Sequence, residues 1–317
     1  MKQIPRPYAG EHDLVRLKQL LVEGKQLSPF SGYAHPGDLD WWVYYDTSGQ
    51  PLRERIWLWE DGERLLGWVF TWPGYESFDL FIHPAVRGQF EETVLDWMEN
   101  YLPSAFQHKH GKPLAELTTY PYADDAHLIS LLKERGYTAS PSMVLFRQSL
   151  AQIPTPLLPP GFRFLERMDI ADVEKRVMVH VSAFTRLNAD GSIASKSKMT
   201  PDYYRRFMDA PGYDPELDVV IIAPDGSFAS FVMAWMDATL KMAEFEPVGT
   251  HQDYQRRGLG KAALLEAMRR LRARGTEVAT VMTWAKDAGN IAFYQSAGFE
   301  VCNTSLAFSK TLIEEGL

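Results

Sequence analysis

The residues most able to do chemistry lie in one loop, HQDYQRRGLGK at 251–261, just before a segment with an apolar stripe. The stripe and Gly275 predict a helix over about 259–274. The first N–H groups of a helix have no partner within it and carry the positive end of its dipole. Glycines let an anion approach closely, and arginine and lysine add charge-assisted contacts. The loop therefore predicts a binding site for an anion, most simply a phosphate.

Two common phosphate motifs do not match this loop. A Walker loop requires G-x-x-x-x-G-K-[ST], and the dinucleotide fingerprint requires three glycines spaced G-x-G-x-x-G. Neither pattern is present at 255–261, QRRGLGK. ATP and NAD are therefore poor candidates for the ligand.

The elements around the loop predict a mixed α/β fold in two domains. Four prolines at 151–160, AQIPTPLLPP, favour an extended linker between a domain at 1–150 and one at 161–317. The second half shows a strand, two helices, three strands, then alternating helix and strand. The second of those helices begins at the N-cap Thr200.

The first half gives a weaker version of the same order, which suggests an internal duplication. Its strands and helices are predicted from residue 54 onwards. Its stretch matching the loop is HPAVRGQFEETVLDWM, in which Arg87 replaces Gln255. Phe90 and Glu92 stand at the positions of Gly258 and Gly260. A ring and a carboxylate would obstruct and repel a phosphate. The tryptophans of this half are interpreted as core and interface rather than as a ligand-stacking surface: Trp41, Trp42, Trp57, Trp59, Trp68 and Trp72.

Composition limits the functional classes. The 317 residues carry a formal net charge of −8, which argues against a broad nucleic-acid surface. One cysteine, Cys302, excludes an internal disulfide, and the eight histidines show no metal-ligand spacing. The N-terminal sequence does not have the pattern of a signal peptide, and no apolar run approaches membrane length. We expect a soluble cytoplasmic protein with no metal, no nucleic acid and no membrane partner.

Two stretches resemble the GNAT acyltransferase superfamily, whose members move an acyl group from coenzyme A to an amine. The loop matches its Q/R-x-x-G-x-G/A pyrophosphate motif, and 289–299, GNIAFYQSAGF, matches a second motif on a helix. The resemblance covers about 160–312, and the tandem layout resembles that of mycothiol synthase and similar two-domain acyltransferases. It implies two tandem GNAT domains, the first degenerate. The matching positions are Gln255, Gly258, Gly260, Asn290, Tyr294, Gly298 and Phe299.

The resemblance implies that acetyl-CoA is the co-substrate and binds only in the second half. Backbone N–H groups of the loop are expected to hold the pyrophosphate. The strand before it is expected to pair its backbone with the pantetheine arm and to polarise the thioester carbonyl through the Val248 N–H. The implied cofactor-binding residues are Val248, Thr250, Gln255, Arg256, Arg257, Gly258, Leu259, Gly260, Lys261 and Asn290.

The proton transfers that amine acetylation requires indicate the candidate catalytic residues. An alkylamine has an ordinary pKa near ~10 and must lose a proton before it attacks. Glu244 and Glu246 lie on one strand face, and the resemblance places a base near them. Either acid fits, so the choice between them stays open. Tyr294 is the candidate acid for the departing thiolate, with direct transfer and no acyl-enzyme. Cys302 is a weaker alternative as a nucleophile because it lies in a strand beyond the active helix.

These features predict an acetyl-CoA-dependent N-acetyltransferase acting on a primary amine of a small molecule or peptide. Two alternatives remain at this stage: an acyl-CoA-binding regulatory protein without turnover, and an acyltransferase that uses a hydroxyl acceptor or a longer acyl group. The sequence identifies neither the acceptor nor the oligomeric state.

Overall fold

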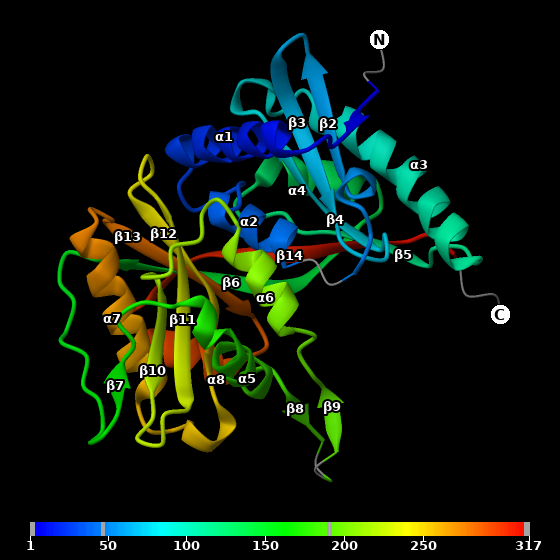
Figure 1. Cartoon of the computed structure of the whole chain (residues 1–317). Helices are drawn as coiled ribbons and strands as arrows, with labels where there is room; N and C mark the ends of the chain where they lie inside the picture. The colour runs from blue at the N-terminus through cyan, green and yellow to red at the C-terminus, as the bar shows by residue number, and fades with distance from the viewer. Residues whose placement is uncertain (1–3, 46–47, 189, 191, 314–317) are drawn as a thin grey trace.

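The chain is organised around one long sheet. A computed structural model describes residues 4–45, 48–188, 190 and 192–313. Within them, twelve strands form a mixed sheet in the order β1-β2-β3-β4-β5-β14-β6-β13-β12-β11-β10-β7 (Figure 1). The first-half elements are β1 Arg6–Pro7, α1 Glu11–Leu27, α2 Pro36–Tyr44, β2 Ile56–Asp61, β3 Arg64–Thr71, β4 Ser77–Ile82, α3 Glu91–His110, β5 Glu116–Thr119, α4 Ala126–Glu134 and β6 Thr138–Ser149. The second-half elements are β7 Arg163–Phe164, α5 Val173–Ala183, β8 Arg186–Leu187, β9 Ile193–Ser195, α6 Pro201–Met208, β10 Asp218–Ile222, β11 Phe228–Asp237, β12 Met242–Thr250, α7 Leu259–Ala273, β13 Val278–Trp284, α8 Ala288–Ser296 and β14 Glu300–Thr311.

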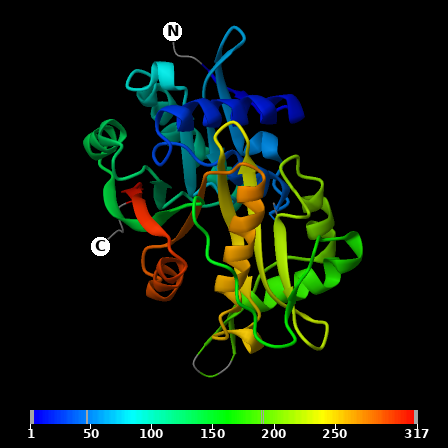
Figure 2. The same ribbon diagram turned by 90° about the vertical axis from the view of Figure 1, so that its left-hand side faces the viewer.

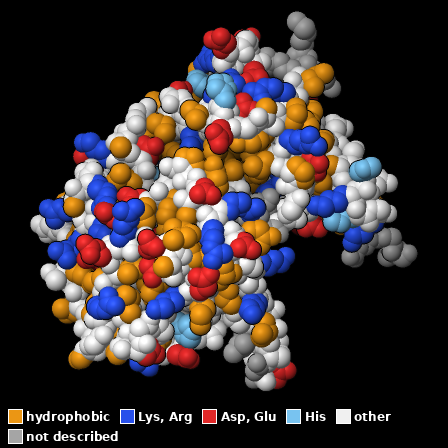
Figure 3. Space-filling view, in the orientation of Figure 1, with side chains coloured by type: hydrophobic (Ala, Val, Ile, Leu, Met, Phe, Trp, Pro, Cys, Tyr) orange, Lys and Arg blue, Asp and Glu red, His pale blue; other side chains and the backbone are white. Residues whose placement is uncertain are grey.

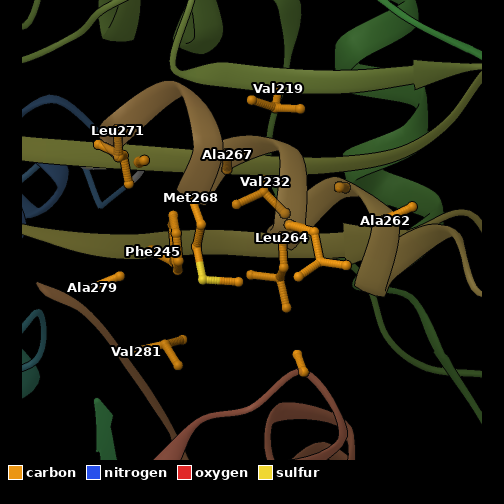
Figure 4. Close-up of a cluster of buried hydrophobic side chains, with 14 of the residues drawn as sticks. Val219, Val232, Phe245, Ala262, Leu264, Ala267, Met268, Leu271, Ala279 and Val281 are labelled. Atoms are coloured by element: carbon orange, nitrogen blue, oxygen red, sulfur yellow. The ribbon is translucent and has the colours of Figure 1, made fainter. Parts of the chain in front are cut away.

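Alternation along the strands of the second half places a core on each face of the sheet. Val219 and its same-face neighbours pack against Leu264 and Met268 of α7, as Figure 4 shows. Val220, one residue further along the strand, belongs to the core on the opposite face, under α5 and α6. This is the period of two expected of a strand buried on both sides. Figure 2 shows α7 crossing one face of β10–β12.

The first half repeats this layering. α3 and α4 cover one face of its strands, where Val69 and Phe78 are buried. α1 and α2 cover the other face, where Trp68 and Phe70 are buried. Trp59 and Trp68 are fully buried, in agreement with the core interpretation of these tryptophans.

Several elements agree with the sequence-based expectation and others do not. α6 begins at Thr200, whose side chain accepts a hydrogen bond from the Tyr203 N–H. The strand predicted after residue 161 is only the two-residue β7, and the helices α1 and α2 were not predicted. Both helices pack their apolar sides on strands that lie later in the chain, and local periodicity does not show that contact.

The halves exchange their last strands. β14, from the second half, lies between β5 and β6, whereas β6, from the first half, pairs with β13. Phe308 of β14 is accordingly fully buried in the core under α3 and α4. Each half thus completes its sheet with a strand that the other half supplies.

Two openings lie in the sheet where parallel strands stop pairing. β12 pairs with β13 only from Met242 to Glu244, although it continues to Thr250. β4 pairs with β5 only at Ser77 and Phe78, although it continues to Ile82. We call these places the second-half opening and the first-half opening. In each opening, backbone N–H and C=O groups of one strand do not pair with the neighbouring parallel strand.

Phe308→Ala tests the strand exchange. We expect it to lower the free energy of unfolding by about 3–5 kcal/mol, because a buried ring is lost from the first-half core. Val301→Ala is the matched control, since Val301 is half exposed on the same strand. Denaturant unfolding would measure both. Loss of stability confined to a separate second-half transition would contradict the exchange.

Candidate active site

The loop before α7 is an open helix N-terminus. Gly258 is its N-cap in the left-handed region at φ 79°, and no side chain caps the helix. Arg256 also has a left-handed φ, of 64°. Residues from Gln255 to Gly258 are exposed, and a Cβ at Gly258 would have nothing within 4 Å. The uncapped N–H groups are therefore accessible to an anion.

Gly260 has a different role from Gly258. A Cβ at Gly260 would lie 3.2 Å from the Phe293 ring of α8 and 3.3 Å from Thr250 Oγ1. The glycine therefore allows the first turn of α7 to pack closely on α8 and β12. Lys261 joins the same two helices, because its Nζ donates to the Ser296 carbonyl at 2.5 Å.

The first half has the same turn with different contents. His83 and His251 each accept a hydrogen bond from the N–H two residues on, at 3.1 and 3.3 Å. Gly88 stands where Arg256 stands and is also left-handed, at φ 78°. In the first half, however, Glu91 Oε2 accepts from the Gly88 N–H at 2.8 Å and from the Phe90 N–H at 3.2 Å. A carboxylate of the chain itself thus occupies the first-half loop.

The helices after β5 and β13 correspond residue by residue. Asp125 caps α4 through the Leu128 N–H, and Asp287 caps α8 through the Asn290 N–H. The alignment gives Leu128 the place of Asn290. The Asn290 amide also donates to Thr283 Oγ1 at 3.3 Å, next to the second-half opening.

A cavity of about 480 Å³ lies between the halves, and both predicted acids line it. Glu244 and Glu246 reach it from β12, and Asp38 and Asp79 reach it from the first half. Glu244 is buried and bonded to the Thr280 hydroxyl, whereas Glu246 is partly exposed. The predicted base candidates thus lie on one cavity wall, and a first-half wall faces them.

Burial and mutual repulsion change the charge of these acids. Desolvation and the Asp38 charge raise the pKa of Glu246 to about 8 and that of Glu244 well above its usual value. Desolvation raises the pKa of Asp38 to about 6 and that of Asp79 to about 7. Near neutral pH such groups can accept a proton or bind a cation.

Tyr294 lies beside the acids but in the core. Its ring packs 5.8 Å from Phe146 and 5.9 Å from Phe299, centroid to centroid. Burial first, and then the charges of Glu246 and Glu244, raise its pKa, so the phenol keeps its proton. Cys302 is half-buried and donates to the Leu145 carbonyl at 3.5 Å. Burial raises its pKa to about 11, which disfavours a thiolate nucleophile.

Sequence reasoning missed the first-half residues of this site. Asp38 follows the helix-starting His35-Pro36, and Asp79 interrupts the apolar strand SFDLFI. That interruption was the available signal, since a lone acid in a buried strand needs a partner. Trp42 and Trp72 also line the cavity, so the core interpretation holds for only some of the tryptophans.

The described residues also bear on metal sites, membrane spans and surface charge. Among the described residues, no group of three or more His, Cys, Asp or Glu could hold a metal ion. Nor does any helix within the described ranges have the length and hydropathy to cross a membrane. On the face in Figure 3, basic and acidic side chains are interspersed.

Comparison with known proteins agrees with the geometry. Residues 185–299 match the acetyltransferase (GNAT) family. A mycothiol acetyltransferase of Streptomyces coelicolor is 25% identical over 232 residues, 73% of this chain and 70% of that protein. A mycothiol acetyltransferase of Thermobispora bispora is 25% identical over 79% of this chain and 82% of its own length.

Solved structures extend the likeness in fold to the whole chain. A GCN5-related N-acetyltransferase from Sphaerobacter thermophilus superposes with a TM-score of 0.66 at 18% identity, over 99% of this chain and 96% of that one. A tandem GNAT protein from the clavulanic acid biosynthesis pathway also gives 0.66, at 14% identity over 99% of both chains. Residues 185–299 therefore carry the match to the acetyltransferase (GNAT) family, and the whole chain has the fold of tandem GNAT proteins; together these findings support a GNAT-type N-acyltransferase.

Proposed function

We propose that the protein transfers an acetyl group from acetyl-CoA to a primary amine of a small molecule or peptide, with the cofactor bound only in the second half. The observation that carries this proposal is the uncapped start of α7 beside a sheet opening that leads to Glu244 and Glu246. An extended acetyl-CoA molecule would then meet, in order, a site for its pyrophosphate, an unpaired strand edge for its pantetheine arm and a base beside its thioester.

The cofactor contacts follow from that order. N–H groups from Arg256 to Lys261 take the pyrophosphate, where Gly258 leaves open space. The unpaired edge of β12 at Val248 and Thr250 binds the pantetheine arm as an added strand. Asn290 lies across the opening, beside β13.

The reaction balances with groups of this chain. The ammonium of the acceptor gives a proton to a carboxylate, and its nitrogen attacks the thioester carbon. The C–N bond forms and the C–S bond breaks, and the thiolate leaves with a proton from Tyr294. The second proton of the attacking nitrogen restores the Tyr294 phenol, and the carboxylic acid releases the first proton to solvent. Glu246 suits the base better than Glu244, because Glu246 is partly exposed and has a pKa of about 8.

The first half, residues 1–150, serves as a structural partner that shapes the acceptor cavity. Its loop is filled by Glu91, and Leu132 replaces Tyr294 in the corresponding helix. The linker at 151–160 joins it to the catalytic half at 161–317. The relatives are named mycothiol acetyltransferases, which supports a small-molecule acceptor.

Two substitutions that each introduce a carboxylate, one in each loop, test the proposed pyrophosphate site. Arg257→Glu should weaken acetyl-CoA binding at least about tenfold, because a carboxylate would face the pyrophosphate. Gln89→Glu makes a matching change in the first-half loop and should leave the affinity unaltered. Isothermal titration would measure both variants, and the double variant Gly258→Glu with Gly260→Glu should bind none. Equal weakening by the two single variants would place the cofactor elsewhere.

The pH profile tests the base. The acceptor kcat/KM should rise with pH and level off near 8, since the raised pKa keeps Glu246 protonated below that value. Glu246→Gln should remove this rise and lower kcat/KM by about 10²–10⁴-fold with little change in acetyl-CoA affinity. Thiol release at subsaturating amine is the measurement. If Glu244→Gln instead removes the rise, Glu244 is the base.

Glu91→Ala tests the filled first-half loop. It should lower the free energy of unfolding by about 1–3 kcal/mol, because the Gly88 and Phe90 N–H groups and Arg87 lose their acceptor. Glu92→Ala is the adjacent control, exposed on the same helix turn, and should change stability by less than about 0.5 kcal/mol. Equal effects in chemical denaturation would refute a structural role for the Glu91 carboxylate.

A further inference from the structure

Asp38 is fixed at the cavity wall by the first turn of α2. Its Oδ2 accepts the His35 N–H at 2.8 Å, and His35 Nδ1 accepts the Gly37 N–H at 3.0 Å. These two bonds are the capping box of the helix, and His35 is buried. Asp38 therefore has one defined place on the first-half wall of the cavity.

The same turn of α2 rests on the strands that carry the candidate bases. α2 packs on β11 and β12, and a Cβ on Gly37 would collide with the Cβ of Trp235. Trp235 pairs with Glu244 in the sheet, and its indole Nε1 donates to the Glu246 carbonyl at 2.8 Å. One tryptophan thus contacts both the helix turn that carries Asp38 and the strand that carries Glu246. The interface between the halves fixes the two carboxyl groups relative to each other.

Among the described residues, the second-half helices packed around Glu246 add little charge there. Arg176 of α5 is fully buried and paired with Asp218. Burial lowers the pKa of His180, on the same helix, to about 3, so His180 is neutral. α7 packs on β12 through apolar side chains, and burial raises the pKa of Tyr294 on α8, so this phenol keeps its proton. The electrostatic influence on the base comes mainly from the first half.

The first half contributes charges of both signs. Burial first, and then the Asp38 charge, raise the pKa values of Glu244 and Glu246. Lys25, buried at the end of α1, opposes this effect at Glu244. The remaining titratable groups on the cavity wall also lie in the first half and are Asp79, Arg87, Glu91, Tyr120, Tyr122 and Asp125.

Asp38 loses its proton before Glu246 as the pH rises. Burial raises the pKa of Asp38 only to about 6, because the His35 N–H and the Lys25 charge favour its carboxylate. The pKa of Glu246 is about 8. At neutral pH Asp38 is therefore a carboxylate that opposes a second negative charge beside it, and Glu246 keeps its proton.

We propose that Asp38 is a positioning residue that acts through Glu246: its fixed negative charge, supplied by the half that binds no cofactor, sets the pH range in which the base is ionised. This inference rests on the proposed N-acetyltransferase function. It gives the first half an electrostatic role in the reaction, in addition to shaping the cavity. Because Asp38 acts on Glu244 as well, the role holds for either candidate base.

Asp38→Asn tests the inference in the full-length protein. The new amide oxygen can still accept the His35 N–H, so the capping box is kept while the charge is removed. The pH at which kcat/KM for the amine reaches half its plateau should fall by about one unit. At about pH 6.5, kcat/KM relative to the plateau should then rise about eightfold, because more of the base is ionised. A purely structural role for Asp38 would lower kcat/KM at every pH without this shift.

The assay compares variants that differ in charge. Thiol release from saturating acetyl-CoA would be followed with butylamine, glucosamine and glycylglycine, and the fastest of the three would be used for the profiles. Asp38→Glu keeps the charge and a residue suited to the capping box, and should retain the wild-type midpoint. Asp61→Asn removes an equal charge from an exposed position in the same half and should also retain it.

A titration without turnover gives a second measurement. Carboxyl ¹³C NMR of the glutamate-labelled protein would follow Glu246, identified by the signal that is lost in Glu246→Gln. Its midpoint should lie near 8 in the wild type and about one unit lower in Asp38→Asn. A wild-type midpoint near the ordinary glutamate value of about 4.3 would overturn the inference, even if Asp38→Asn did not fold.

The outcomes separate the inference from the proposed function. Acetyl-CoA binding without transfer to any of the amines would overturn the proposed function and the role of Asp38 with it. Transfer with the same pH midpoint in the wild type and in a folded Asp38→Asn protein would overturn the role of Asp38 alone. A shift of equal size in Asp61→Asn would also overturn it, because net charge rather than the position of Asp38 would then be responsible.

Discussion

The antiparallel pairing of β6 with β14 is the contact on which the site depends. Each of these long strands comes from one half and completes the sheet of the other, so the two halves share one continuous ladder. Ser142, Met143 and Ser305 of these strands line the cavity between the two openings. Without the exchange, Glu246 and Asp79 would face separate surfaces. Through this ladder the first half forms one wall of the cavity that we propose as the acceptor site.

The loops before α3 and α7 share a turn, but their N–H groups are bonded to a carboxylate in the first half and uncapped in the second. The histidine-capped turn and the left-handed residue are present in both, at Gly88 and at Arg256. Besides Phe90 and Glu92 at the positions of Gly258 and Gly260, the loops differ where Glu91 stands in place of Leu259. A leucine side chain at that position turns into the core, whereas a carboxylate accepts the N–H groups that would otherwise be free. The backbone matches at Gly88 and Arg256 but differs at the N-cap, where Phe90 has φ −118° and Gly258 has φ 79°.

The sequence best predicted those features whose residues lie close together in the chain. The loop at 255–261 and α7 follow from glycines, arginines and an apolar stripe that lie close together in the chain, and Glu244 and Glu246 follow from their spacing. Asp38 and Asp79 could not be assigned to the site, because their relation to Glu246 depends on strands paired across more than a hundred residues. The exchange of β14 was equally hidden, since either arrangement gives that strand the same apolar pattern. Local spacing thus pointed to the half that we propose to be catalytic, whereas the proposed acceptor wall could be recognised only from the fold.

One physical property links the proposed base to the proposed acceptor. Burial that raises the pKa of Glu246 also makes the ionised cavity unfavourable in the absence of a counter-ion. An arriving ammonium supplies that counter-ion and favours the carboxylate, which is the form that accepts its proton. Once the proton has moved and the amide has formed, the reacting nitrogen is neutral and the attraction at that end is lost. Selection of a cation, activation of the amine and release of the product would then all be consequences of one desolvated carboxylate.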